Sequence, residues 1–155
     1  MTFHEQVHAA YSPVQDWLAT LEGDDPRAFG PQAIILRSDH LTVVDMTPPG
    51  GDKSAEMLAF GNVVAEGAVF TARASRMTYS QANGLLVLDG DGRTDAELFR
   101  QEHPGSTASH FTARRILYWP KINQAKVDGV RTLELNQYPN GEVKSGARLP
   151  PGLNR

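Results

Sequence analysis

Three segments of the chain share a pattern in which the apolar residues change from one side of a strand to the other. The segments are residues 34–43, 70–79 and 109–118. In the second, Phe70, Ala72 and Ala74 alternate on one parity, whereas Met77 and Tyr79 follow on the opposite parity. A strand with one buried face can change parity only where a bulge or a sharp bend takes up an extra residue. Each segment therefore predicts a long strand that turns a corner.

Turn-forming residues separate these segments. The expected corners lie at Ser38-Asp39-His40, Ser75-Arg76 and Arg114-Arg115, and glycines after the segments predict further corners at Gly61, Gly90 and Gly129. Loops are expected at 22–31, 47–54 and 102–108, and a hairpin turn at Gln81-Ala82-Asn83-Gly84. Short alternating runs between turns are typical of an all-β domain. We expect bent strand pairs that stack into two short sheets closed over an apolar interior.

The composition limits the class of protein. With 155 residues, 40% hydrophobic and 21% charged, the chain has the size and composition of one globular domain. A net charge of −3 argues against a nucleic-acid-binding protein. The absence of cysteine excludes disulfides and thiolate metal sites. The first residues contain no apolar signal core, so we expect either a protein that stays inside the cell or part of a longer exported one.

Four stretches, taken in order, resemble the OstA-like family. This is the domain of the lipopolysaccharide-transport proteins LptA and LptC and of the periplasmic part of LptD. The stretches are F-G-N-V (60–63), F-T-A-R-A-S-R-M-T-Y-S (70–80), G-L-L-V-L-D-G-D-G (84–92) and A-R-R-I-L-Y (113–118). They match the family's ordered units G-N-V, A-x-x-h-x-Y and G-x-h-x-L-x-G, where h is apolar. The resemblance covers residues 32–136, which we expect to form the β domain. Residues 1–31 are expected to form a lead, with a strand or short helix, followed by a linker. Residues 137–155 are expected to be a flexible tail, and both of these segments lie outside the resemblance.

The resemblance implies a jelly-roll fold of stacked antiparallel strands, folded like a taco, that holds lipid acyl chains without being an enzyme. It implies a location in the periplasm or cell envelope, with lipid or lipopolysaccharide and other OstA-like domains as partners, and no cofactor. On this hypothesis the groove is lined by Leu41, Val43, Phe70, Met77, Tyr79, Leu86, Leu88, Ile116 and Tyr118. Possible anion contacts at its mouth are Arg73, Arg76, Arg114 and Arg115.

A second hypothesis gives the same residues a structural role. If the interior is completely packed, the aromatic and aliphatic residues form an ordinary core, and the arginines are solvated strand-face residues. The domain would then be an assembly module that stacks through its exposed edge strands. The alternation of apolar residues is the same for a filled core and for a lipid-filled groove.

Two motifs suggest metal chemistry. His4-Glu5-x-x-His8 matches the zinc-protease pattern, which requires both histidines on one face of a helix. As a strand, the stretch would instead place Val7, Ala9 and Tyr11 on one face and hold the two histidines about 13 Å apart, too far for one zinc. Pro13 interrupts a long helix here, although a separate helix could start at Ser12. We therefore expect a strand with surface histidines and no metal.

The acidic stretch with Asp89, Asp91 and Asp95 suggests a calcium loop only in part. Arginines stand at Arg93 and Arg100, where the fifth and twelfth positions of an EF-hand loop require ligands. A β-turn at a sheet corner explains the glycines of this stretch better.

Overall fold

The chain forms eight β-strands in the computed structural model, which describes residues 1–11, 30 and 32–134. The strands are β1 (Thr2–Tyr11), β2 (Ile34–Asp45), β3 (Ala55–Gly67), β4 (Phe70–Ser80), β5 (Leu85–Asp89), β6 (Ala96–Arg100), β7 (Ser109–Trp119) and β8 (Gln124–Glu134). The prediction of an all-β protein is confirmed. Within the described ranges there is no helix, hence none able to cross a membrane. Three features considered from the sequence lie outside these ranges: the helix that could start at Ser12, the tail at 137–155 and the linker at 22–31, apart from Gly30.

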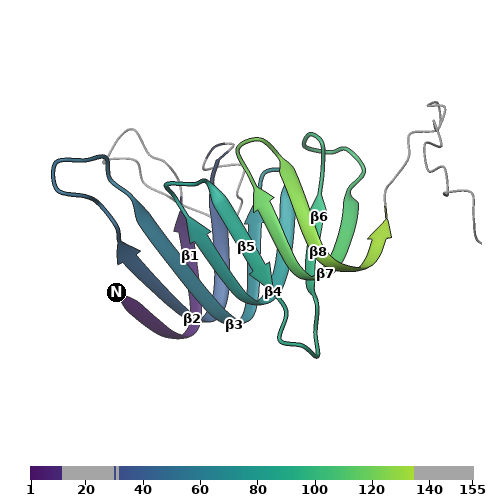
Figure 1. Cartoon of the computed structure of the whole chain (residues 1–155), viewed down its shortest axis with the longest axis horizontal. Helices are drawn as coiled ribbons and strands as arrows, with labels where there is room; N and C mark the ends of the chain where they lie inside the picture. The colour runs from purple at the N-terminus through teal and green to yellow at the C-terminus, as the bar shows by residue number, and fades with distance from the viewer. Residues whose placement is uncertain (12–29, 31, 135–155) are drawn as a thin grey trace, which may run out of the picture.

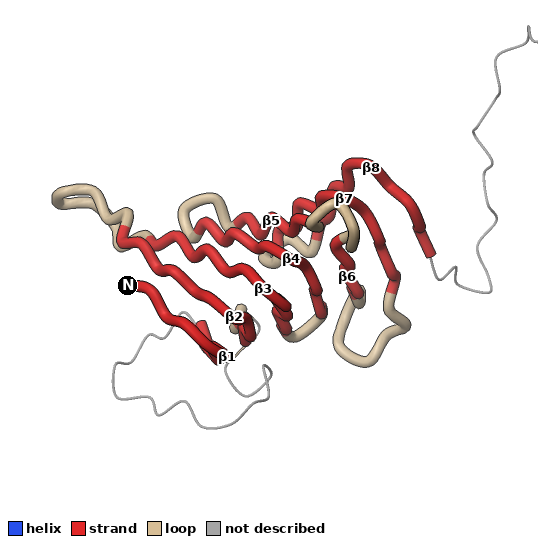
Figure 2. Tube along the Cα trace, turned by 90° about the horizontal axis from the view of Figure 1, so that it is seen from below, coloured by secondary structure: helices blue, strands red, loops and turns tan. Residues whose placement is uncertain are grey.

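All eight strands belong to one antiparallel sheet. Strands β1 to β4 pair in chain order and lie side by side (Figures 1 and 2). Strands β5 and β6 then share the next position, because β5 pairs with residues 76–80 of β4 and β6 pairs with residues 70–73. Strand β7 pairs with both of them, and β8 pairs with β7. The N-terminal strand is thus part of the same sheet as the expected β domain.

Each long strand bends near its middle, so the sheet folds into two halves that face each other (Figure 1). Half A contains residues 40–45, 55–60, 76–80, 85–89 and 115–119. Half B contains residues 34–37, 63–67, 70–73, 96–100 and 109–113. The first and last strands follow the same bend, since β1 pairs with both halves of β2, and β8 with both halves of β7.

The bends coincide with breaks in strand register. In β3, Gly61 and Asn62 lie opposite the single residue Ser75 of β4, and the β2–β3 register shifts beside Asp39. Gly61 and Asn62 have φ angles of +77° and +47°, the left-handed values that absorb an extra residue. Apolar residues therefore change parity here and still face the interior. The predicted corners at 38–40, 75–76 and 61 are confirmed.

The corner of β3 also packs tightly against the corner of β2. A Cβ atom on Gly61 would clash with Oδ2 of Asp39 and lie 2.8 Å from its Cβ. The same Oδ2 atom accepts a hydrogen bond of 2.9 Å from Nδ2 of Asn62. Gly61 is therefore required twice, once for its backbone conformation and once for the space that Asp39 occupies.

The corner between β5 and β6 is built as a loop at residues 90–95. The Asp91 carboxylate accepts hydrogen bonds from the backbone N–H groups of Arg93, at 2.9 Å, and Thr94, at 2.7 Å, and these bonds lower its pKa. Gly90 donates its backbone N–H to the carbonyl of Arg114 at 2.9 Å, which joins this loop to the corner of β7. The acidic stretch therefore forms a turn, as expected, and the described residues contain no cluster of three or more side chains suited to a metal ion.

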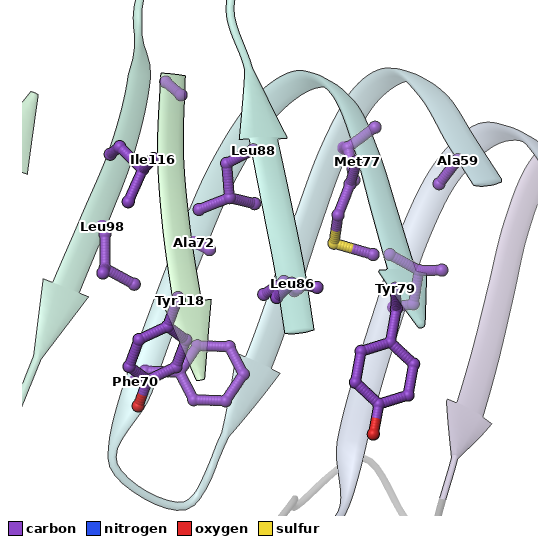
Figure 3. Packing of buried hydrophobic residues seen from close by; sticks show 14 of the residues in the cluster. Ala59, Phe70, Ala72, Met77, Tyr79, Leu86, Leu88, Leu98, Ile116 and Tyr118 are labelled. Carbon is purple, nitrogen blue, oxygen red and sulfur yellow. The ribbon is translucent and has the colours of Figure 1, made fainter. Parts of the chain in front are cut away.

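Apolar side chains from all eight strands fill the space between the two halves. In β4, Phe70 and Ala72 point inward before the bend, and Met77 and Tyr79 point inward after it (Figure 3). The most deeply buried large side chains are Tyr118, Ile35, Leu41, Met77, Leu86, Leu88, Leu98, Ile116 and Val63. At about 1.5–3 kcal/mol for each fully buried large apolar side chain, this interior is the main source of stability.

We predict that Gly61→Ala destabilises the fold much more than Gly92→Ala. Both glycines have positive φ angles, +77° and +88°, but a Cβ on Gly92 meets nothing within 4 Å. The left-handed backbone costs about 1–2 kcal/mol in each variant, and the clash with Asp39 adds roughly 1–3 kcal/mol in Gly61→Ala alone. Urea unfolding of the two variants and the wild type measures this difference. Equal losses of stability would mean that the corner has room for a side chain.

Candidate functional site: an apolar cavity at the N-terminal end of the folded sheet

An apolar cavity of about 160 Å³ lies between the two halves near β1. We call it the inner cavity; its lining residues are Phe3, Ala9, Ala10, Tyr11, Ile34, Leu36, Leu41, Val43, Met57, Met77, Tyr79 and Leu86. The tyrosine hydroxyl groups are the only polar side-chain atoms of this lining. A closed apolar cavity of about 150 Å³ stays dry and binds a ligand the size of benzene. The inner cavity is therefore suited to a short hydrocarbon segment and not to a polar substrate.

The predicted groove residues divide into two groups. Leu41, Val43, Met77, Tyr79 and Leu86 line the inner cavity, as the groove hypothesis expects. The remaining four lie in the packed interior and are at most 6% exposed: Phe70, Leu88, Ile116 and Tyr118. We call the end of the interior near these four residues the packed end; the inner cavity borders the other end, near β1.

The residues that sequence reasoning missed come mainly from β1 and from the start of β2. Phe3, Ala9 and Tyr11 line the inner cavity because β1 pairs with β2 and continues the sheet. The alternation of Val7, Ala9 and Tyr11 correctly indicated one face of a strand, and all three pack against the core. No local pattern indicated that this face continues the apolar face of the next strand.

Hydrogen bonds across the two halves close the packed end. The Tyr118 hydroxyl donates to Oδ1 of Asn123 at 2.9 Å, and Nδ2 of Asn123 donates to the carbonyl of Gln101 at 2.8 Å. Nη1 of Arg100 donates to the carbonyl of Asn123 at 2.8 Å. The rings of Phe70 and Tyr118 meet below this network, with centroids 4.8 Å apart. These contacts join the β7–β8 turn in half A to the end of β6 in half B.

A tyrosine pair spans the two halves at the other end. The rings of Tyr11 and Tyr79 lie 5.6 Å apart, and their hydroxyl groups share a hydrogen bond. Burial raises the pKa of Tyr11 and raises that of Tyr79 to about 12, so both hydroxyls stay neutral at physiological pH. Outside the pair lies a smaller hollow of about 90 Å³, which we call the vestibule. Its lining residues are Tyr11, Gln32, Ile34, Tyr79, Gln81, Gly84, Pro120 and Lys121.

The inner cavity and the vestibule share Tyr11, Ile34 and Tyr79. The tyrosine pair therefore separates an apolar space from a polar one. Lys121 supplies the positive charge of the vestibule, and it has no ion pair within the described part of the chain. This arrangement has the polarity of an amphiphile, with a hydrocarbon space inside and an anion-compatible space outside.

The predicted arginines lie elsewhere. All four are exposed, and Arg76 and Arg115 belong to a row of side chains in register along the corners, away from the vestibule. In this row Arg76, Asp89, Arg115 and Asp128 alternate in charge across β4, β5, β7 and β8. Nε of Arg115 donates to Oδ1 of Asp89 at 2.6 Å, and this bond, together with the charges of both aspartates, raises the pKa of Arg115. Arg115 is thus ion-paired with Asp89, and none of the four arginines lines the vestibule, whereas Lys121 does. Lys121 is therefore the better candidate for an anion contact there.

The two histidines of the zinc-protease pattern do not share a helix face. They lie on a strand, as expected, and a bulge at Glu5 and Gln6, with φ angles of +66° and +45°, separates them. His4 pairs in register with His40, and His8 pairs with Arg37. The arrangement required by a zinc protease is therefore not formed.

A hollow of about 510 Å³ beside the bends of β3 and β4 and the loop at 90–95 is larger but less suited to a ligand. Its lining combines Arg73 with the carboxylates of Asp91, Asp95 and Glu97. The Asp91 carboxylate already accepts two backbone hydrogen bonds. A mixed and partly satisfied lining offers no consistent charge to an ion or substrate, so the inner cavity remains the better candidate.

No family model matches the chain, and no curated protein is significantly similar to it. The likeness to the OstA-like family therefore stays an expectation that depends on the four stretches named above. The functional argument depends on the geometry of the inner cavity and the vestibule.

We predict that stability falls as the pH rises from 10 to 12. A tyrosine in an unfolded chain titrates near pH 10, whereas burial raises the pKa of Tyr79 and of Tyr118 to about 12. Between these values the unfolded chain binds fewer protons than the folded one, so the free energy of unfolding decreases. Below pH 10 this stabilisation is fully present.

Ultraviolet absorbance of tyrosinate measures these titrations, with urea unfolding at each pH as the second readout. Tyr79→Phe and Tyr118→Phe should each remove one late-titrating group. If all tyrosines ionise together near pH 10 in the folded protein, the hydroxyl groups of Tyr79 and Tyr118 are not buried in solution.

Proposed function

We propose that this chain is a non-enzymatic lipid-binding module that holds an acyl chain between the two halves of its sheet. The observation that carries the proposal is the inner cavity, an apolar space bordered by side chains of the buried core. Packed interiors rarely keep such space, because each lost contact reduces stability. A space that apolar side chains line and that adjoins a polar vestibule therefore favours a role in ligand binding.

The size of the inner cavity sets the strength of binding. A space of about 160 Å³ accommodates roughly six carbon atoms, by comparison with the benzene-sized cavity of similar volume. At about 0.8 kcal/mol per buried methylene, six contribute about 5 kcal/mol, which limits the dissociation constant to roughly 0.2 mM or weaker once the entropic cost of association is included. Tighter binding requires contacts from the head group or from a longer chain that continues along exposed apolar residues. Phe3, which lines the inner cavity and is 42% exposed, offers such a surface.

The vestibule suggests how the head group is held. The hydroxyls of Tyr11 and Tyr79 can hydrogen-bond to head-group oxygens, and Lys121 can pair with a negative charge. An anionic amphiphile would therefore enter with its chain in the inner cavity and its head in the vestibule. This orientation needs no catalytic group.

In its more specific form, the proposal assigns the chain to the OstA-like jelly-roll type, with lipopolysaccharide as the ligand and the periplasm as the location. The support for this form is the ordered series of units between residues 60 and 118, together with bent strands that close over an apolar interior. Lipopolysaccharide carries both acyl chains and negative charges, which fits the two polarities of the site.

A structural role is the second candidate, and the free sheet edges favour it. Within the described residues β1 pairs only with β2, and β8 pairs only with β7. Each edge therefore presents unpaired backbone groups that can add the strand of another domain. Concentration-dependent association in sedimentation, without bound lipid and unaffected by added lipid, would support this role over lipid binding.

We predict that Met77→Asp abolishes acyl-chain binding and that Met77→Leu retains it. Met77 lines the inner cavity and is 1% exposed, so aspartate places a carboxylate in an apolar space, whereas leucine conserves volume and polarity. Native mass spectrometry after incubation with an envelope lipid extract detects the bound lipid. Fluorescence titration with a twelve-carbon fatty acid probe measures the affinity.

Ala9→Leu tests the same space without the risk of unfolding, because Ala9 is only partly buried. The larger side chain fills part of the inner cavity, and we expect at least tenfold weaker binding with unchanged urea stability. If folded Met77→Asp and Ala9→Leu both bind the probe as the wild type does, the acyl chain does not occupy this cavity.

We predict that Lys121→Gln weakens binding of dodecanoate about two- to fivefold, the effect expected of one exposed charge, and leaves binding of dodecanol unchanged. The two ligands share a hydrocarbon chain and differ in the charge of the head. Lys126→Gln is the matched control, because Lys126 is also an exposed cation but does not line the vestibule. Equal losses for the acid and the alcohol would place the head group away from Lys121.

A further inference from the structure

Two histidines face each other where β1 and β2 bend. His4 and His40 are partners in register, and their Nδ1 atoms lie 2.8 Å apart. Their ring centroids are separated by 5.0 Å, and the ring planes are nearly perpendicular at 78°. The side chain of His4 is exposed, and that of His40 is partly exposed. The pair is accessible to solvent and lies outside the lining of the inner cavity.

The chemistry of the contact points to a cation. A hydrogen bond between two Nδ1 atoms needs one nitrogen with a proton and one with a free lone pair. If the proton leaves, both lone pairs point into the space between the rings, and a metal ion can take the proton's place. In a tetrahedral site with metal–nitrogen bonds of 2.0–2.1 Å, two nitrogens lie about 3.3 Å apart. The rings therefore need to separate by only about half an ångström.

The neighbouring residues hold the pair in this geometry. The ring of Phe60, the partner of His40 on β3, stacks on His40 with centroids 4.6 Å apart and planes at 19°. Residues Glu5 and Gln6 fix the bend directly after His4 through their positive φ angles. Both imidazoles are thus oriented by the strand register before any ion binds, which lowers the entropic cost of binding.

We propose that His4 and His40 form a cross-strand binding site for a late first-row divalent cation such as Zn²⁺, Cu²⁺ or Ni²⁺. Imidazole nitrogen suits these ions, and water completes the coordination on the exposed side. The ion would bind the edge strand β1 to β2. It would not create a protease centre, since His8, the second histidine of the sequence motif, pairs with Arg37 beyond the bend. The site shares no residue with the lining of the inner cavity, so the proposal does not rest on lipid binding.

Isothermal titration calorimetry of the full chain with ZnCl₂ near neutral pH tests the proposal. We expect one Zn²⁺ per wild-type chain, an affinity at least tenfold lower in His4→Gln and in His40→Gln, and an unchanged affinity in His8→Gln. Zn²⁺ should also raise the melting temperature of the wild type and of His8→Gln but not that of His40→Gln. Circular dichroism without metal shows whether each variant is folded.

Three results would overturn the proposal. One is the absence of Zn²⁺ binding to the wild type, and another is unchanged binding in a folded His40→Gln variant. The third is a loss of Zn²⁺ affinity in His8→Gln as large as that in His4→Gln. That result would mean that the ion is bound by His4 and His8, the two histidines of the sequence motif. Copper electron paramagnetic resonance adds an independent readout, because two imidazole nitrogens bound to Cu²⁺ give a nitrogen hyperfine pattern that should be lost in His40→Gln.

Discussion

The structure depends on one steric constraint, which is that each long strand must bend and still keep its apolar residues inside. In β3 the bend consists of two residues with left-handed backbone, Gly61 and Asn62, opposite one residue of β4. The Asp39 side chain fills the space over Gly61 and accepts a hydrogen bond from Asn62. Without this extra residue the strand would expose its apolar side chains beyond the bend. The facing halves, the interior between them and the cavity all follow from these corners.

The interior differs between its two ends, and this difference gives the molecule a candidate function. Near β7 the halves are held together by the Tyr118 hydroxyl, Asn123 and Arg100, and aromatic rings fill the space. Near β1 the rings of Tyr11 and Tyr79 meet across the two halves, with apolar space behind them. A ligand can therefore occupy one end while the packed end maintains the fold. Binding requires no opening of the whole sheet.

Strand β1 connects the two proposals. It forms one edge of the sheet, contributes Phe3, Ala9 and Tyr11 to the inner cavity, and carries His4 opposite His40. An ion bound by the histidines would hold in place the strand that borders the acyl chain. An edge strand with few neighbours is also the element that separates most easily from a sheet. Within the described residues, the inner cavity is therefore bordered by a strand that pairs on one side only.

The strands and their bends were predictable from the amino-acid sequence. The parity changes, the turn residues and the glycines at the corners reflect local rules, because side chains alternate along every strand and only certain residues accept left-handed backbone. Inward-facing residues such as Met77 and Leu88 were predictable for the same reason. Which of them border the inner cavity depends on how the two halves close: Met77 does and Leu88 does not. The three-dimensional fold settles this, since both residues follow the same alternation along their strands. It also decided that β1 completes the cavity, that Lys121 and not the arginines lies at its entrance, and that His4 meets His40. These are contacts between residues distant in sequence, which no local pattern encodes.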